Sequence, residues 1–168
     1  DLSMFTPAQQ ESLRHALNVA KQFAEKPFGW ILFQGTYGCG KTHLAAAIGN
    51  VCLERGDNVL FITAPDLLDH LRSAYGPSSE LGYDQTFDRI RNAPVLVLDD
   101  LGVENPSAWA QEKLFQLLNH RYSHQMPTVI TTNAALDGLD QRVRSRLLDN
   151  QVNRHVKISA PDFRSLVP

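Results

Sequence analysis

The feature that most constrains this chain is a glycine-rich run at residues 35–42, which reads Gly35-Thr36-Tyr37-Gly38-Cys39-Gly40-Lys41-Thr42. It matches the pattern G-x-x-x-x-G-K-[ST] at every fixed position. Glycine lets the backbone curl so that successive N–H groups point at one bound anion. A helix that follows such a loop adds its positive N-terminal end to the same site. The run therefore predicts a phosphate-binding loop between a strand and a helix.

The segments on either side of the loop fit this prediction. Residues 30–33 form a short apolar run, typical of a parallel strand that is covered on both faces. Residues 41–54 have helical periodicity, and Gly56 is the expected C-terminal cap. The apolar face expected for this helix consists of Leu44, Ala45, Ile48, Val51 and Cys52. We expect Lys41 to reach the β- and γ-phosphates of a nucleoside triphosphate and Thr42 to ligate Mg²⁺; the alternative is a plain glycine-rich turn.

The rest of the chain alternates between strand and helix patterns. Strands are expected at 30–33, 59–62, 94–98, 128–131 and 155–158, and helices at 7–26, 41–54, 66–75, 84–91, 105–123 and 139–148. The first helix begins with a capping box at Thr6 and is expected to bury Leu13, Ala16, Leu17, Ala20 and Ala24. This alternation indicates an α/β fold, a three-layer P-loop NTPase sandwich with a five-stranded parallel sheet and helices on both faces.

Composition narrows the possible partners and the compartment. The net charge is −2, which excludes a bulk electrostatic attraction to nucleic acid. The charge is uneven: residues 1–120 hold 9 Lys and Arg against 14 Asp and Glu, whereas residues 121–168 hold 7 against 4. No apolar stretch approaches the roughly 20 residues that span a bilayer, and residues 1–7 lack the basic segment and apolar core that a signal peptide would show. Two cysteines without metal-ligand spacing fit a reducing compartment, so we expect a cytoplasmic protein without a membrane partner.

Two carboxylates follow the expected strand 94–98, and an amide follows the expected strand 128–131. Ligands of open α/β sheets bind at the carboxyl ends of the strands, where the phosphate-binding loop also lies. We assign Asp99 to the Mg²⁺ shell and Asp100 to the attacking water. Asn133 is expected to contact both the γ-phosphate and the water. The alternatives are an Asp pair that starts a turn and an Asn that caps one.

Three arginines alternate along the expected helix 139–148, at Arg142, Arg144 and Arg146. Residues four apart share a helix face, so Arg142 and Arg146 lie together. Such a face is a candidate arginine finger that acts on the nucleotide of a neighbouring copy. The residues alone leave open which arginine acts, and the alternative is a solvated basic face.

Four segments together resemble a known family: residues 38–48, 95–102, 132–133 and 142–147. They look like the AAA+ ATPase domain of DnaC/DnaI-type helicase loaders, with the IstB transposition ATPases as close relatives. The resemblance covers essentially the whole chain, and the His43-Leu44-Ala45 sequence after the loop is its most distinctive local mark. It implies that Asn133 is sensor 1, Arg146 the arginine finger and Arg164 a sensor 2 arginine.

The resemblance also implies a function. The implied protein is an ATPase that uses ATP and Mg²⁺ as cofactors. It would assemble into a ring or spiral on single-stranded DNA and load the replicative helicase. We expect residues 1–168 to be a single AAA+ domain without a full lid, a fragment that lacks the N-terminal partner-binding domain of the loaders. Asp100 stands where many AAA+ proteins have Glu, which implies slower hydrolysis. The DNA-contacting stretch would be residues 65–83, through His70, Arg72 and Tyr75.

Three alternatives remain at this point. An IstB-like helper would share the ATPase core and act with a transposase on duplex DNA. A small-molecule kinase would use the same loop and would need a lid arginine cluster and an acceptor pocket. A nucleotide-dependent binding module would scarcely hydrolyse ATP, and the short side chain of Asp100 is its only indication.

Overall fold

A computed structural model describes residues 4–74, 80–102 and 107–165 of the chain. Its centre is a five-stranded sheet in which every strand pair is parallel, in the order β2-β3-β4-β1-β5. The strands are β1 (Trp30–Gly35), β2 (Val59–Thr63), β3 (Val95–Asp99), β4 (Thr128–Thr132) and β5 (Asn153–Ile158). Strands β3, β4 and β1 are therefore neighbours, and the loops that follow them meet at one edge of the sheet.

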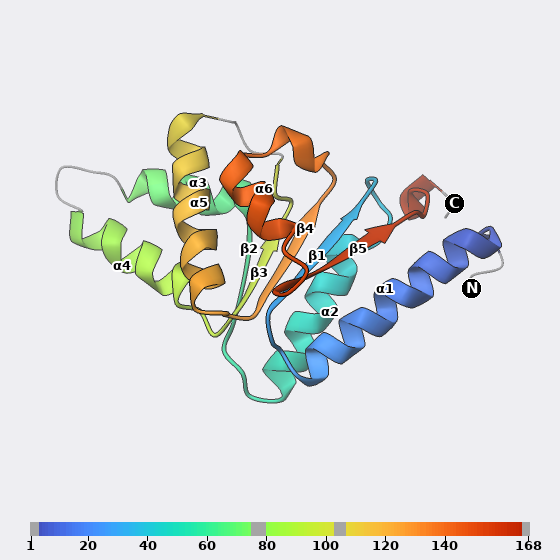
Figure 1. Cartoon of the computed structure of the whole chain (residues 1–168). Coiled ribbons are helices and arrows are strands. Elements are labelled where there is room, and N and C mark those ends of the chain that lie inside the picture. The colour runs from blue at the N-terminus through green and yellow to red at the C-terminus, as the bar shows by residue number, and fades with distance from the viewer. Residues whose placement is uncertain (1–3, 75–79, 103–106, 166–168) are drawn as a thin grey trace.

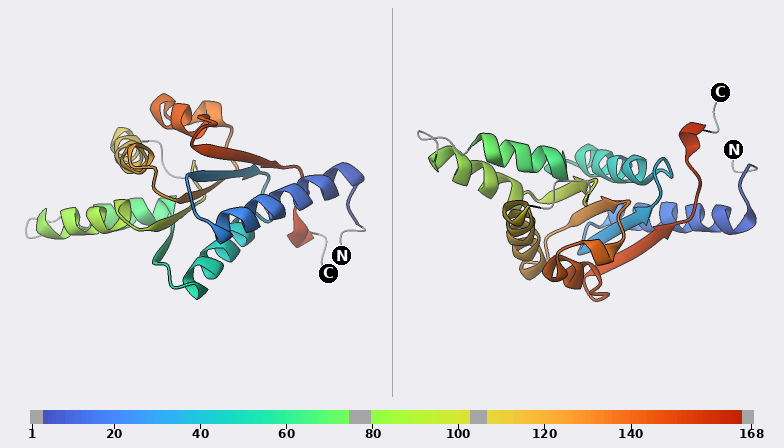
Figure 2. Two further views of the ribbon diagram at one scale, coloured as in Figure 1. Left: turned by 60° about the horizontal axis from the view of Figure 1, so that its bottom comes forward. Right: turned by 90° about the horizontal axis from the view of Figure 1, so that it is seen from above.

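Helices cover both faces of this sheet (Figure 1). They are α1 (Pro7–Glu25), α2 (Lys41–Glu54), α3 (Ala64–Ser73), α4 (Glu80–Arg91), α5 (Ala108–Ser123) and α6 (Gln141–Leu147), with 3-10 turns η1 (Leu136–Gly138) and η2 (Phe163–Ser165). Helices α1 and α2 pack on one face, and α3 to α6 pack on the other. The left view of Figure 2 shows α1 and α2 on one side of the strands and α5 and α6 on the opposite side. The expected fold class is confirmed.

The beginnings of the helices follow from their capping residues. The Thr6 hydroxyl accepts a hydrogen bond from the backbone N–H of Gln9, and the Gln9 side-chain oxygen accepts one from the backbone N–H of Thr6, which confirms the capping box. Ser107 caps α5 in the same way as a hydroxyl acceptor. Asp140 caps α6, so its carboxylate lies at the positive end of that helix.

Several expected boundaries are wrong. Helix α4 begins at Glu80 instead of residue 84, with Gly82 inside it; one glycine costs about 1 kcal/mol, which the buried Phe87 and Ile90 offset. Helix α5 begins at Ala108, and the expected start at residues 105–106 lies outside the described residues. Helices α3 and α6 and strand β5 also differ by two residues or more at one end, as is usual for pattern-based boundaries.

Two residues expected in the core lie on the surface. Leu17 is 45% exposed and Val51 is 44% exposed. Helix α1 instead buries Val19 and Phe23 against the sheet. The reason is that the contact face of each helix is turned from the expected one, toward Val19 and Phe23 in α1 and toward Gly49 in α2, which periodicity alone does not resolve. Leu67, Leu68 and Leu71 of α3 are buried in the core.

Arg121 of α5 is fully buried near the starts of β3 and β4. Its guanidinium donates hydrogen bonds to the carbonyl oxygens of Arg91 (3.0 Å), Ala93 (2.7 Å) and Pro127 (2.6 Å) and to the hydroxyl of Thr128 (2.9 Å). Burial lowers the pKa of Arg121 to about 10, so the group stays charged at neutral pH. It ties α4, α5 and β4 together at the end of the sheet opposite the phosphate-binding loop.

The two ends of the described chain lie side by side in Figures 1 and 2. Phe5, before α1, packs on Phe163 of η2 with ring centroids 4.8 Å apart. This contact fixes the C-terminal turn next to α1 and the loop after β1. None of the described helices combines the length and the apolar character that crossing a membrane requires.

Candidate functional site

The loop after β1 has the backbone shape that its glycines predict. Gly38 has φ +68° and Gly40 has φ +98°, both in the left-handed region that favours glycine. Gly40 directly precedes α2, so the free N–H groups of the first turn of that helix point into the curl of the loop. The loop of residues 35–42 and the first turn of α2 thus form a cradle of the kind that binds phosphate groups.

The chain after β5 closes one side of this cradle. The backbone N–H of Phe163 donates to the carbonyl oxygen of Gly38 at 3.1 Å. A Cβ atom added at Gly38 would meet the Oδ1 atom of Asp162 at 1.6 Å. The positive φ angle favours glycine at this position, and any larger residue would also displace the Asp162 carboxylate.

Lys41 is buried at the base of the loop. Its Nζ atom donates to the carbonyl oxygen of Thr36 at 2.7 Å and lies 3.9 Å from the sulfur of Cys39. The amine is therefore held inside the curl by the loop's own backbone. Thr36 is itself held by a hydrogen bond to the carbonyl oxygen of Ala160.

Thr42, Asp99 and Thr131 form a hydrogen-bonded cluster where β3 and β4 end. The Thr42 hydroxyl lies 3.0 and 3.1 Å from the two carboxylate oxygens of Asp99. Thr131 donates to the same carboxylate at 2.5 Å and accepts the backbone N–H of Asp100 at 2.9 Å. Thr131 thereby holds the Asp99 carboxylate and the Asp100 backbone. Nothing in the sequence indicates this role beyond a hydroxyl at the carboxyl end of a strand.

Asp100 has an unusual backbone and an unusual acidity. Its φ is +56°, which turns its side chain away from the line of β3. Burial raises the pKa of its carboxyl and the negative charge of Asp99 adds to this, whereas the charges of Lys41 and Arg164 act in the opposite direction. The Asp100 carboxyl thus binds a proton more tightly than an ordinary Asp does, although Lys41 and Arg164 are near. A shifted pKa of this kind is typical of functional sites.

Asn133 follows β4 on the same edge. Its Nδ2 atom is buried and has no hydrogen-bond partner among the described residues. The loop that carries it is fastened to β1, because Gln34 donates to the carbonyl oxygen of Ala134 at 2.9 Å. The Gln34 amide oxygen in turn lies 2.8 Å from the Nε2 atom of His155. A buried donor without a partner fits a group that awaits a ligand.

A cavity of about 740 Å³ opens beside the cradle. Its lining residues come from α1, from the loop and the first turns of α2, and from η2: Leu13, Arg14, Leu17, Gly38, Cys39, Gly40, Lys41, Thr42, His43, Leu44, Ala46, Phe163 and Arg164. The volume is that of a small-molecule site. The apolar side chains of Leu13, Leu17 and Phe163 offer a wall for a nucleotide base. Sequence analysis missed this wall because its parts are far apart in the chain and Leu17 has the spacing of a core residue.

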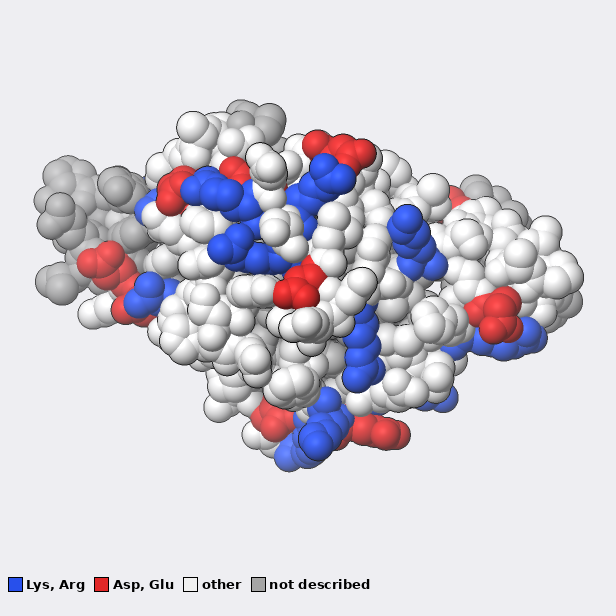
Figure 3. Space-filling model, in the orientation of Figure 1, with Lys and Arg blue, Asp and Glu red and all other residues white. Residues whose placement is uncertain are grey.

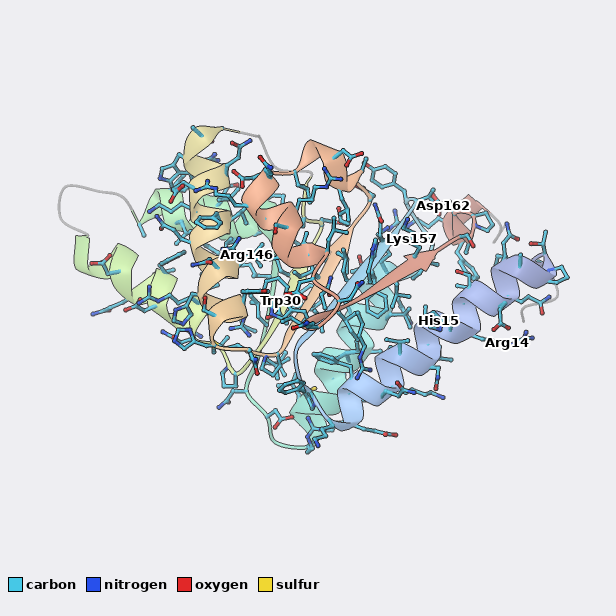
Figure 4. All side chains as sticks on the ribbon, in the orientation of Figure 1. Arg14, His15, Trp30, Arg146, Lys157 and Asp162 are labelled. Carbon is cyan, nitrogen blue, oxygen red and sulfur yellow. The ribbon has the colours of Figure 1, made fainter. Side chains whose placement is uncertain are left out.

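Only some of the residues predicted for the site line the cavity. Lys41, Thr42, His43 and Arg164 line the cavity, and Asp99 and Thr42 are in contact. Arg146 is elsewhere: Figure 4 shows it beside α5 and α6, well away from Arg14 and Asp162. It is not among the residues that line the cavity.

Basic side chains gather over α6 and the adjoining part of α5 (Figure 3). Arg142 pairs with Glu112 and Asp140 at 3.1 Å each, and Arg144 pairs with Asp137 at 2.6 Å. Arg146 has no such ion pair among the described residues. Its Nε atom donates to the Oδ1 atom of Asn119 at 3.0 Å.

The residues present fit both ATP and Mg²⁺. The cradle has glycine where a Cβ would collide, and a buried amine stands inside it. Thr42 and Asp99 supply the hydroxyl and carboxylate oxygens that Mg²⁺ prefers, and Mg²⁺ commonly takes its other ligands from phosphates and water.

Helix α3 carries two of the residues that the resemblance implies for DNA contact. His70 and Arg72 are exposed, and Arg72 pairs with Asp69 at 3.2 Å and lies over the ring of Trp109 at 5.1 Å. Tyr75 lies outside the described residues.

Comparison with known proteins gives one family and several relatives. The family described as IstB-like ATP binding protein matches residues 8–156. The replicative helicase loader DnaC of Escherichia coli is 32% identical over 142 residues, which are 83% of this chain and 58% of that protein. The replicative helicase loader DnaI of Bacillus subtilis is 27% identical over 79% of this chain and 42% of its own length. The chain thus spans less than two thirds of the relatives it matches.

A crystal structure of the DnaC helicase loader has the same fold. It superimposes with a TM-score of 0.78 at 27% identity and covers 95% of this chain and 96% of that one. This likeness covers nearly the whole of both chains.

Proposed function

Because the chain belongs to the family of IstB-like ATP binding proteins, we propose that it hydrolyses ATP in an Mg²⁺-dependent reaction that a neighbouring copy completes. The observation that carries this proposal is the separation of Arg146 from the chain's own nucleotide cavity, together with its lack of a carboxylate partner among the described residues. A guanidinium in that position has no role in its own site and is suited to a phosphate of another subunit.

The residues of the cradle hold the triphosphate. Backbone N–H groups at the start of α2 and the Lys41 amine bind the phosphate oxygens, and the Leu17 and Phe163 side chains pack on the base. Thr42 and Asp99 hold Mg²⁺, which when bound neutralises charge on the phosphates. The Thr131 hydroxyl keeps the Asp99 carboxylate oriented.

Asp100 and Asn133 act on the attacking water. Asp100 orients the water and accepts its proton, and its raised pKa suits a base that must capture a proton. Asn133 donates its partnerless Nδ2 hydrogens to the γ-phosphate or to that water. Arg164, exposed at the mouth of the cavity, adds a cation that favours the bound phosphates.

The biological role that we propose is loading of a replicative helicase on single-stranded DNA, with copies assembled in a ring or spiral. The named helicase loaders among the relatives support this role. DNA contact is assigned to the exposed His70 and Arg72 of α3, where a cation and a ring suit a nucleic acid strand. A protein of this kind works in the cytoplasm.

A second candidate is a transposition helper that acts with a transposase on duplex DNA. The family description favours it, because IstB-like proteins give that family its name. Both candidates share the ATPase site. They differ in DNA preference: a loader binds a single-stranded oligonucleotide more tightly than the same sequence as a duplex, and a transposition helper shows the reverse order.

The test is ATP turnover as a function of protein concentration, with and without single-stranded DNA, for the wild type and Arg146→Ala. The proposal predicts turnover per subunit that rises with concentration and falls by about a thousandfold in Arg146→Ala, with unchanged ATP affinity. Lys41→Ala should weaken ATP binding itself by about 100-fold, because it removes a charged donor from the phosphates. Turnover that is independent of concentration and of Arg146 would favour a kinase or a passive nucleotide-binding module.

A further inference from the structure

The guanidinium of Arg146 is held by one side chain of α5. Both Nε and Nη2 of Arg146 donate to the same acceptor, the Oδ1 atom of Asn119, and the Nε bond measures 3.0 Å. Nη1 donates to the carbonyl oxygen of Arg142 at 2.8 Å. Three of the five N–H bonds of this guanidinium are thus used, and the other two have no hydrogen-bond partner within residues 4–74, 80–102 and 107–165.

Two aromatic rings complete the support. The Arg146 guanidinium carbon lies 4.8 Å from the ring centroid of Phe115 and 5.5 Å from that of Tyr122. The hydroxyl of Tyr122 donates to the carboxylate of Asp149, which fixes that ring. Because Phe115, Asn119 and Tyr122 follow one another at helical spacing, a single face of α5 forms the support.

The support is chemically unusual in that it carries no charge. The neighbouring arginines both have carboxylate partners: Glu112 and Asp140 for Arg142, and Asp137 for Arg144. Asn119 offers Arg146 an acceptor of nearly the same shape as aspartate without its negative charge. The positive charge of Arg146 is therefore fixed in direction but not neutralised.

We propose that Asn119 is a positioning residue for hydrolysis, which orients the Arg146 guanidinium toward a neighbour's nucleotide while leaving its charge intact. This inference rests on the proposed role of Arg146 between subunits. A freely rotating arginine would lose rotamer freedom on each encounter, and a salt-bridged one would first have to leave its carboxylate. An arginine supported by an uncharged acceptor and two rings needs neither step.

Two substitutions separate orientation from charge. Asn119→Asp keeps the acceptor and its shape but pairs Arg146 with a carboxylate, so it should lower kcat of the assembled protein by about 10- to 100-fold. Asn119→Leu removes the acceptor and adds no charge, so it should lower kcat by about 3- to 10-fold. In both variants we expect ATP affinity and the protein concentration at half-maximal turnover to change by less than about twofold, because neither the cradle nor its nucleotide is touched.

The matched control is Gln116→Glu, which adds the same charge to the exposed side of α5, where Gln116 contacts Glu112 and Lys113. It should leave kcat unchanged. Thermal melts of all variants, compared with the wild type, identify any loss of folding. If Asn119 had a purely structural role, its variants would lower the melting temperature and the ATP affinity together, without a selective loss of kcat.

The outcomes distinguish this inference from the proposal on which it rests. If Arg146→Ala abolishes assembly-dependent turnover but Asn119→Asp retains it, the positioning role of Asn119 is overturned and the role of Arg146 stands. If Arg146→Ala itself has no effect, the proposed function fails and the role of Asn119 fails with it. A selective loss of kcat in Asn119→Asp that exceeds the loss in Asn119→Leu supports the inference.

Discussion

The Thr42 hydroxyl lies 3.0 Å from Oδ1 and 3.1 Å from Oδ2 of Asp99, and this contact joins the first turn of α2 to the end of β3. The two residues are far apart in the sequence, yet they provide one hydroxyl and one carboxylate at a single point. The Thr42 hydroxyl and the Asp99 carboxylate lie next to the cradle, so a cation held between them would lie against the phosphates of a bound nucleotide.

Thr42→Val removes the hydroxyl but keeps the branched shape, so it tests the proposed Mg²⁺ site. We expect the Mg²⁺ concentration at half-maximal turnover to rise by about 10-fold or more. ATP binding in the presence of EDTA should remain within about twofold of the wild type, since the cradle is unchanged. Equal Mg²⁺ requirements in the two proteins would remove Thr42 from the metal site.

Asp100→Asn should alter the dependence of stability on pH. Burial and the charge of Asp99 raise the pKa of Asp100, so the folded state binds this proton more tightly than the unfolded state. The contribution of Asp100 to stability therefore falls as pH rises from the ordinary Asp pKa of about 3.9 through the raised value. The neutral variant avoids this loss, and asparagine also tolerates the positive φ.

The measurement for Asp100→Asn is the melting temperature without nucleotide from pH 4 to pH 8. The variant should be the more stable protein at pH 7, and its advantage should shrink toward pH 4. It should also bind ATP normally and turn it over more slowly, because the carboxylate that accepts the proton of the water is gone. An advantage that grows as pH falls would contradict the raised pKa.

Leu17→Asn tests the apolar wall of the cavity. Leu17 is 45% exposed, so the substitution should hardly affect folding, but it removes apolar contact with the base and should weaken ATP binding by about 5- to 10-fold. Val51→Asn is the matched control, because Val51 is 44% exposed on α2 and does not line the cavity. Equal affinities for the two variants would show that the base binds elsewhere.

Arg121→Met should destabilise the fold by about 3 kcal/mol or more, because three backbone carbonyls and a hydroxyl would lose a buried donor. Chemical denaturation provides the measurement. Arg154→Met is the control, since Arg154 is exposed on β5 and the change there should stay within about 0.5 kcal/mol. A small effect at Arg121 would mean that water replaces the guanidinium at these carbonyls.

The sequence predicted the parts of the site that depend on local chemistry. The cradle, Lys41 and the order of strands and helices follow from a contiguous motif and from periodicity, and the structure has them where they were expected. The contact of Thr42 with Asp99 agrees with the expected metal site, since parallel strands end at one edge. The roles assigned to the site residues remain predictions, namely those of Lys41, Thr42, Asp99, Asp100, Asn133, Arg146 and Arg164.

The parts that were missed depend on contacts between distant segments. Phe163 reaches the loop because it packs on Phe5, and Leu17 faces the cavity because α1 is rotated from its expected face. Asn119 had no sequence signal, since an asparagine on a helix is usually solvated. Its contact with Arg146 needs the packing of α6 on α5, which periodicity does not specify.

The central claim is that Arg146 completes the active site of another subunit, and mixing two inactive variants tests it most directly. Lys41→Ala retains the arginine but not the nucleotide site, and Arg146→Ala retains the site but not the arginine. With equal amounts in a head-to-tail assembly, we predict recovery of about a quarter of wild-type turnover per subunit. If the mixture stays inactive although each variant assembles with the wild type, Arg146 does not act between subunits.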